Sequence, residues 1–261
     1  MKTILNKITL AAIAAVLLGA SACREKNNEP VPISNGSLTM KFEHTWGGSQ
    51  AWEPNKTFVH ARTNDTLTFT MLKYYISNIR LQRSDETWWS QPNSYYLVDA
   101  STNASPTITI TDVPGTEYIA MQYTIGVDSA RNVSGAQTGA LSVINGMFWD
   151  WNTGYIMAKA EGTSPNANTV SKTFAIHLGG FAGPNKVVTT KNIDFRAEAN
   201  RYVAIGDVYN PTMTVKVDVA SLWKTSPGVG TISTVHMEGP QAATFGKDFF
   251  GSFTFSNITL K

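Results

Sequence analysis

The sequence predicts an all-β fold, an antiparallel β-sandwich or Greek-key arrangement with long functional loops. Three observations predict it. Apolar and polar residues alternate in many short runs, turn-forming residues separate these runs, and no stretch shows a sustained helical period. At most, residues 197–203 and 220–224 are expected to form single helical turns. We expect one domain over residues 38–261, which is long enough to bury a sizeable core.

Residues 1–22 have the features of a bacterial secretory signal. Lys2 and Lys7 form a basic start, and an apolar run follows at residues 8–18, too short to cross a bilayer. Small residues at 19–22 then lead into Cys23, the only cysteine of the chain. A cysteine directly after such a segment is the acceptor that lipoprotein processing requires, so we predict lipidation at Cys23. The alternative is an ordinary signal peptide, with Cys23 as a stray thiol.

Residues 23–37 are predicted to be the lipidated cysteine and a flexible tether. The segment is polar, carries two prolines and a glycine, and has too little apolar surface to pack. Removal of Lys2 and Lys7 takes the formal charge from +2 to 0. A mature chain without net charge does not attract nucleic acid or anionic lipid electrostatically, so we expect membrane contact through the anchor alone. The expected location is the periplasm or cell surface, on a bacterial outer membrane.

The predicted strands follow from period-two alternation, which places successive side chains on opposite faces. The alternating apolar residues are Leu38, Met40 and Phe42; Leu67, Phe69 and Met71; Ile108 and Ile110; Ile119, Met121, Tyr123, Ile125 and Val127; Phe174, Ile176 and Leu178; Met213, Val215, Val217 and Val219; and Phe253 and Phe255. Turn chemistry separates them, for example at Asn64-Asp65, Pro114-Gly115 and Gly183-Pro184.

One segment, residues 126–155, shows little of this alternation. It is rich in glycine and ends in the aromatic residues Phe148, Trp149, Trp151 and Tyr155. A loop this long within a compact domain is usually functional when it is ordered. Trp149 and Trp151 therefore have two interpretations: plain core aromatics, or part of a binding site.

The catalytic signatures that we can recognise are absent, so we expect a binding protein and not an enzyme. The sequence has no G-x-S-x-G elbow and no H-E-x-x-H motif. Residues 239–248 resemble a phosphate loop only loosely, because the spacing is wrong and Asp248 replaces the required hydroxyl residue. Residues 150–154 echo a calcium loop but lack its later acidic ligand.

The four histidines are His44, His60, His177 and His236. His44 continues the inward parity of Leu38, Met40 and Phe42, so it is expected at the core-facing end of a strand. His177 lies near a strand end beside Gly179-Gly180. Each is either a metal ligand or a buried, hydrogen-bonded ring. Imidazoles without a thiolate suit copper or zinc, and the lack of neighbouring carboxylates argues against magnesium and calcium.

Several blocks of the chain resemble the MbnP-like copper-binding family in order and spacing. These relatives of the methanobactin-associated periplasmic protein include lipoproteins of the Bacteroidetes type, which this chain resembles. The similarity covers roughly residues 38–260. The matching blocks are MLKYYISNIRL at 71–81, YLVD at 96–99, GVDS at 126–129, NVSGAQTG at 132–139, GMFWDWNTGY at 146–155 and FAIHLGG at 174–180.

The resemblance implies a secreted β-sandwich that binds copper without turnover. In relatives, two histidines and a tryptophan oxidised to kynurenine hold the ion, and a dihaem peroxidase-like partner performs the oxidation. Carried onto this chain, the metal ligands are His44 and His177, with Trp151 or Trp149 as the modified residue and Trp151 slightly favoured. His60 and His236 match nothing in the family pattern. A two-histidine and aniline site suits Cu(I).

Two classes of function follow. The first is an extracytoplasmic, lipid-anchored protein that captures or stores copper. The second is a non-catalytic surface module for glycan or protein that has lost the metal. For the second, Trp88 and Trp89 beside Asp85-Glu86 suit sugar stacking, although an exposed hairpin tip explains them equally well.

Overall fold

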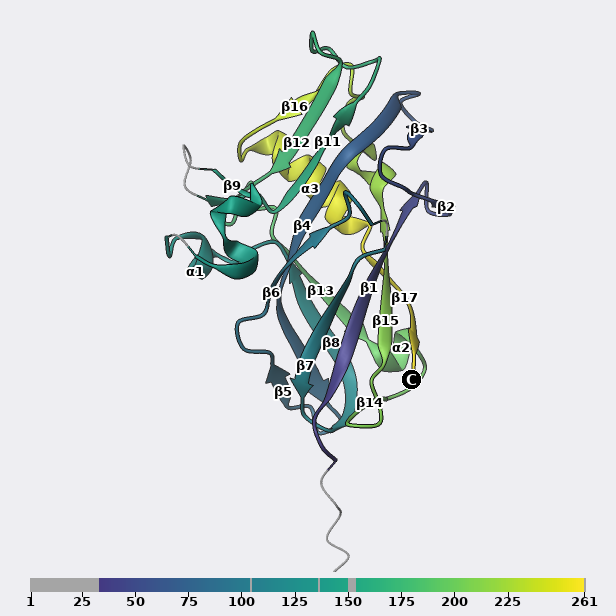
Figure 1. Ribbon diagram of the computed structural model, residues 1–261, viewed down its shortest axis with the longest axis vertical. Coiled ribbons are helices and arrows are strands. Elements are labelled where there is room, and N and C mark those ends of the chain that lie inside the picture. Colours follow the sequence, from purple (N-terminus) through teal and green to yellow (C-terminus); the bar gives the residue numbers. More distant parts are fainter. Residues whose placement is uncertain (1–32, 104, 136, 150–153, 261) are drawn as a thin grey trace, which may run out of the picture. The chain divides into compact units, whose positions relative to one another are not determined.

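Two curled β-sheets enclose the core of the domain, as a computed structural model of the chain shows (Figure 1). The structure describes residues 33–103, 105–135, 137–149 and 154–260. The predicted signal, Cys23 and the predicted tether as far as residue 32 lie outside the described residues. Trp151 also lies outside the described residues. Residues from Ile33 onward form one compact unit.

The first sheet has five strands in the order β17-β15-β1-β2, with β7 paired to β1. Its strands are β1 (Gly36–Trp46), β2 (Gln50–Ala51), β7 (Thr107–Val113), β15 (Thr212–Asp218) and β17 (Thr254–Thr259). β1 and β15 pair in parallel, with Phe42 opposite Val215. Alternation along β1 buries Leu38, Met40 and Phe42 on the inner face, as the sequence predicts.

The second sheet has ten strands in the order β13-β8-β4-β11-β12-β16, with β14 on β8 and with β3, β5 and β6 on β4. Its strands are β3 (Thr57–Val59), β4 (Thr66–Arg83), β5 (Trp88–Ser90), β6 (Tyr95–Asp99), β8 (Thr116–Ile125), β11 (Ala158–Thr163), β12 (Thr173–Leu178), β13 (Thr189–Asp194), β14 (Val203–Ile205) and β16 (Thr234–Val235). β12 and β16 pair in parallel. The all-β class is confirmed, but the sheets are mixed and not antiparallel throughout.

The helix α3 (Pro240–Gly251) shows that the expected absence of a sustained helical segment was wrong. Proline at the first helical position is compatible with a helix start. Ala242, Phe245, Phe249 and Phe250 recur at helical spacing and are buried. Phe249 packs edge-on against Tyr74 of β4, with ring centroids 6.2 Å apart, so α3 closes the core on the inner side of the second sheet.

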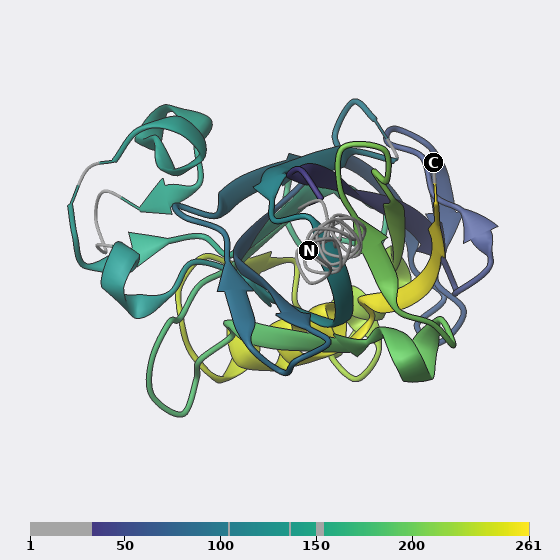
Figure 2. The ribbon, with the colours of Figure 1, turned by 90° about the horizontal axis from the view of Figure 1, so that it is seen from below.

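The remaining elements are short. They are α1 (Ser129–Asn132), α2 (Phe195–Glu198), the 3-10 turns η1 (Gly139–Leu141), η2 (Val143–Asn145) and η3 (Val219–Trp223), and the ribbon of β9 (Phe148–Trp149) and β10 (Gly154–Tyr155). α2 and η3 fall at or beside the two predicted helical turns. Seen from below, the α1–β10 segment stands at one side of the curled sheets, and α3 lies along another (Figure 2). No helix within the described residues is long and apolar enough to span a membrane.

Internal hydrogen bonds order the segment from α1 to β10. Asp128 caps the first turn of α1 and also accepts hydrogen bonds from Asn78 and from the Tyr95 hydroxyl, which tie the segment to β4 and β6. The buried Asn132 accepts a hydrogen bond from the backbone N–H of Tyr155 at 2.9 Å. The long loop predicted at 126–155 is thus, where described, a chain of short elements fixed to the sheet.

Candidate metal centre

His177 projects from the outer face of the second sheet. Its neighbours in β12, Ile176 and Leu178, are buried on the inner face, and strand alternation turns His177 the other way. His177 lies opposite Lys159 of β11 in the antiparallel register, so these two side chains share the outer face. The ring is half-buried.

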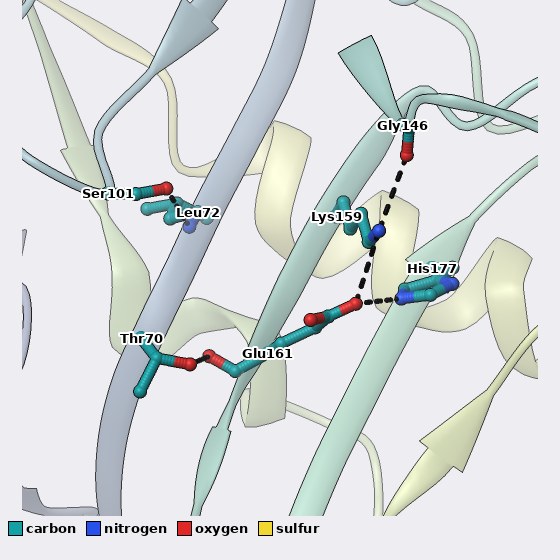
Figure 3. Close-up of polar contacts among 7 residues, drawn as sticks. All are labelled: Thr70, Leu72, Ser101, Gly146, Lys159, Glu161 and His177. Atoms are coloured by element: carbon teal, nitrogen blue, oxygen red, sulfur yellow. Dashed lines mark hydrogen bonds and ion pairs between the residues drawn. The ribbon is translucent and has the colours of Figure 1, made fainter. Parts of the chain in front are cut away.

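Glu161 of β11 holds one side of the His177 ring. The His177 Nε2 atom lies 2.7 Å from Glu161 Oε1 (Figure 3). The hydrogen bond from His177 lowers the pKa of Glu161 to about 2, against the opposing effect of burial, and the Lys159 ammonium 3.3 Å away adds to the lowering. Glu161 is therefore a carboxylate, and it accepts a hydrogen bond from Nε2–H. A neutral imidazole that donates from Nε2 presents its lone pair at Nδ1.

His236 stacks on His177. It follows β16 directly, and β16 pairs in parallel with β12 so that Val235 lies opposite Ile176. The two imidazole rings are nearly parallel, at 8°, with centroids 4.7 Å apart. Partial burial and then the neighbouring His177 lower the pKa of His236 below its usual value. The ring is therefore mostly neutral at pH 7, the form in which imidazole binds a metal ion.

Trp149 lies beside the end of the same strand. A Cβ atom added to Gly179 would fall 2.1 Å from Cζ3 of the Trp149 ring, so only glycine allows the indole to lie there. Gly179 follows His177 by two residues. Trp149 is almost fully buried, at 6% exposure, and belongs to the ribbon of β9 and β10. Trp151, the other candidate for oxidation, lies outside the described residues.

His44 lies on the other side of the second sheet. It is buried at 2% exposure, and its Nε2 atom is 3.2 Å from the hydroxyl of Tyr74. Tyr74 pairs with Ala158, which pairs with Leu178, so these residues share the inner face. His177 is on the outer face, and the expected convergence of His44 with His177 is not present in this structure. The prediction that His44 points inward is confirmed.

His60 is engaged at both ring nitrogens. Its Nε2 atom lies 3.0 Å from the Ala220 carbonyl oxygen, and its Nδ1 atom accepts a hydrogen bond from the Thr63 N–H at 3.2 Å. This is the pattern of a structural histidine.

The structure thus brings together His177, His236, Glu161 and Trp149 on the outer face of β11 and β12. Sequence reasoning missed Glu161 and left His236 without a role. Within the described residues, no group of three or more His, Cys, Asp or Glu side chains is arranged to enclose a metal ion. The two imidazoles beside a buried indole can supply two nitrogen ligands, and a further ligand has to come from outside this pair.

The fold and this site define a β-sandwich domain with a surface pair of histidines. The chain belongs to the MbnP family, whose model matches residues 35–237. Its fold is similar to that of MbnP from Methylosinus trichosporium, with a TM-score of 0.51 at 14% sequence identity, over 80% of this chain and 84% of that one. No curated protein sequence matches the chain.

Proposed function

We propose that the protein is a non-catalytic, extracytoplasmic copper-binding lipoprotein that captures or stores the ion. The observation that carries the proposal is the His177–His236 pair with Glu161 behind it. Histidines that ligate metals commonly donate their other ring N–H to a carboxylate, which fixes the tautomer and raises the basicity of the ligating nitrogen. Glu161 does this for His177 at 2.7 Å.

The two imidazoles suit copper by their chemistry. Imidazole nitrogen is a good ligand for copper, and the site offers no thiolate to shift the preference elsewhere. His236 is exposed, so its ring is free to rotate out of the stack and direct a nitrogen to an ion held by His177 Nδ1. The neutral state of His236 removes the charge repulsion that would oppose a cation. A pair of nitrogen ligands favours the low-coordinate Cu(I) ion.

The third ligand in this proposal comes from the aromatic segment, as kynurenine formed from Trp149 or Trp151. The position of Trp149 beside Gly179 supports a role for this segment. Oxidation breaks the indole C2–C3 bond and adds two oxygen atoms, one from each of two equivalents of peroxide, and each peroxide leaves its other oxygen as water. Hydrolysis then removes the formyl group as formate and leaves an aniline nitrogen. A dihaem peroxidase-like partner fits this chemistry.

Copper analysis of purified protein tests the assignment. We expect one copper ion per wild-type chain, and loss of tight loading in His177→Ala and His236→Ala. Glu53→Gln is the control, because it changes an exposed side chain that lies outside the pair. Unchanged copper loading in the double variant His177→Ala/His236→Ala would exclude the proposed site. Mass spectrometry of protein from its native host would show whether Trp149 or Trp151 is oxidised.

The anchor is tested separately. If Cys23 is lipidated, Cys23→Ala should move the protein from the membrane fraction to the soluble fraction while the domain stays folded. A variant that fractionates like the wild type would exclude the lipid anchor, with no consequence for the copper site.

A further inference from the structure

A second polar surface lies on the outer face of the second sheet, away from the histidine pair. Ser90 of β5, Arg80 of β4 and Gln122 of β8 lie side by side in the antiparallel register, and the row ends at Asn192 of β13. Trp88 lies two residues before Ser90 on the same face of β5. In Figure 1, β5 is in the lower part of the molecule, whereas β12 and β16 are in the upper part.

Arg80 is the unusual member of this row. Its Nε atom is inaccessible to solvent and has no hydrogen-bond partner among the described residues. None of the ion pairs within the described part of the chain includes Arg80. Its guanidinium instead lies 4.3 Å from the centre of the Trp88 ring. Arg80 lines a groove, and its guanidinium has no carboxylate partner among the described residues, so an anionic ligand in that groove would gain a charge-assisted hydrogen bond from it.

A groove of about 280 Å³ adjoins Arg80, and its lining is rich in amides. It is lined by Asn78, Ile79, Arg80, Ser90, Gln91 and Gln122. Two of the amides are held in place. Gln91 donates to the Tyr96 hydroxyl at 2.6 Å, and Gln122 donates to the Asn192 side chain. A fixed amide offers both donor and acceptor atoms, which suits the hydroxyl groups of a sugar.

We propose that this groove binds an acidic saccharide, a glycan chain that carries uronic acid residues. The carboxylate of the sugar ring pairs with the Arg80 guanidinium, its hydroxyl groups meet the amides of Gln91 and Gln122, and its apolar face packs on Trp88. Trp88 remains 38% exposed and is thus available for stacking. Neither a carboxylate nor an imidazole lines the groove, so it has no ligands for copper.

The charge around the groove is compatible with an acidic ligand. Two carboxylates lie near the groove. Asp128 accepts hydrogen bonds from Asn78 of the lining and from the Tyr95 hydroxyl. Asp194 ends the neighbouring row beyond Ala120. The charge of Asp194 is countered by Arg196, whose Nη2 atom lies 3.1 Å from Asp194 Oδ2. Arg80 has no such counter-ion in the part of the chain that the structure describes. The saccharide site is independent of the proposed copper function, and each can fail without the other.

Binding of oligogalacturonate to the full chain in detergent tests this inference, with the fully methyl-esterified oligosaccharide as the neutral counterpart. We expect binding of the acidic form that quenches tryptophan fluorescence and weakens with salt. Arg80→Gln and Trp88→Ala should each weaken it at least tenfold, a loss of about 1.4 kcal/mol. Lys56→Gln, which removes an exposed cation in the turn before β3, should leave it unchanged.

Three outcomes would overturn the inference. They are no binding of the acid, equally tight binding of its methyl ester, or binding that survives both Arg80→Gln and Trp88→Ala. Unfolding of each variant in urea is measured alongside. Arg80 and Trp88 are on the outer face of the sheet, so both variants should remain folded; if Trp88→Ala is unstable, Gln122→Ala tests the same groove. Copper loading should be the same in all of these variants.

Discussion

The position of a residue in the alternation of its strand decides which face of the sheet its side chain occupies, as His177 shows. Phe174, Ile176 and Leu178 are buried along β12, and that alternation already places His177 on the opposite face. His44 shares the inward parity of its own strand and meets Tyr74 in the interior. Both facts are present in the sequence. The convergence of the two histidines was expected from their placement at strand ends, near glycine turns and inside family-matching blocks, and none of these features takes account of the parity of β12.

At Glu161, we expect Glu161→Gln to weaken copper binding by about 10- to 100-fold, the usual range for a partner behind a metal-ligating histidine. The amide still accepts a hydrogen bond, but it has no negative charge to stabilise the polarised His177 ring. Copper affinity measured by competition with a chelator checks this. Glu53→Gln, at an exposed carboxylate that pairs with Lys56, serves as the control. Equal affinity in Glu161→Gln and the wild type would show that Glu161 has no part in the site.

At Gly179, we expect Gly179→Ala to destabilise the protein by on the order of 1–3 kcal/mol, the range for over-packing in a filled interior. The new methyl group would lie 2.1 Å from Cζ3 of Trp149, so the indole must move. Unfolding in urea, followed by tryptophan fluorescence, measures the loss. Gly251→Ala is the matched control, since no atom lies within 4 Å of its added Cβ. Identical stability of the two variants would contradict the close packing of Trp149 on the strand end.

Some residues of the site could not have been found from sequence. His236 follows a two-residue strand, and only the parallel pairing of β16 with β12 brings it to His177. Glu161 belongs to β11, whose alanine-rich sequence lacks a clear alternation of large apolar residues. These contacts join segments that are distant in the chain, and short-range patterns carry no information about such pairings.

At the scale of elements, long alternating strands such as β1, β8 and β15 are predictable because each buries one face. The helix α3 was also predictable, since Ala242, Phe245, Phe249 and Phe250 follow a helical period. The same segment loosely resembles a phosphate loop, and that resemblance obscures its helical period. The parallel pairing of β1 with β15 was not predictable, because alternation shows which face is buried and does not identify the neighbouring strand.

The attachment of the α1–β10 segment to the sheet depends on the ionised Asp128. Burial alone would raise the pKa of Asp128, but hydrogen bonds from Tyr95, Asn78 and the backbone lower it below its usual value. A lowered folded-state pKa means that this stabilisation is present above the unfolded pKa of about 3.9 and is lost as the pH falls through the folded value. We therefore expect the segment to loosen in acid, below about pH 4.

Hydrogen exchange of residues 126–149 at pH 7 and in acid, corrected for intrinsic rates, measures this loosening. Asp128→Asn should lose protection already at pH 7 and show little further change in acid. Asp207→Asn, at an exposed turn whose carboxylate accepts a hydrogen bond from the N–H of Val208, should behave like the wild type. Protection that falls equally in Asp128→Asn and the wild type as the pH is lowered would exclude Asp128 as the responsible group.

At the scale of the whole molecule, the two sheets are linked through the interior where His44 of β1 meets Tyr74 of β4. The His44 ring also packs against Trp52, with centroids 5.6 Å apart. The outer face of the second sheet, by contrast, carries both polar sites, with the histidine pair on β12 and β16 and the amide groove on β4, β5 and β8. The interior therefore provides stability, and both of the proposed binding sites lie on the outer face.

This division predicts opposite effects for two histidine substitutions. His44→Ala leaves a cavity and removes a partner of the buried Tyr74 hydroxyl, so it should lower the free energy of unfolding by on the order of 2–4 kcal/mol. Copper at 100 times its Kd should still add about 2.7 kcal/mol, as for any ligand that binds only the folded state. His177→Ala should show the reverse: near wild-type stability without copper and no gain with it.

Urea unfolding with and without Cu(I) measures both quantities in each variant. The opposite result would be a His44→Ala protein that loses the copper-dependent gain in stability and a His177→Ala protein that keeps it. That result would show that the metal site lies in the interior and not on the outer face of the sheet.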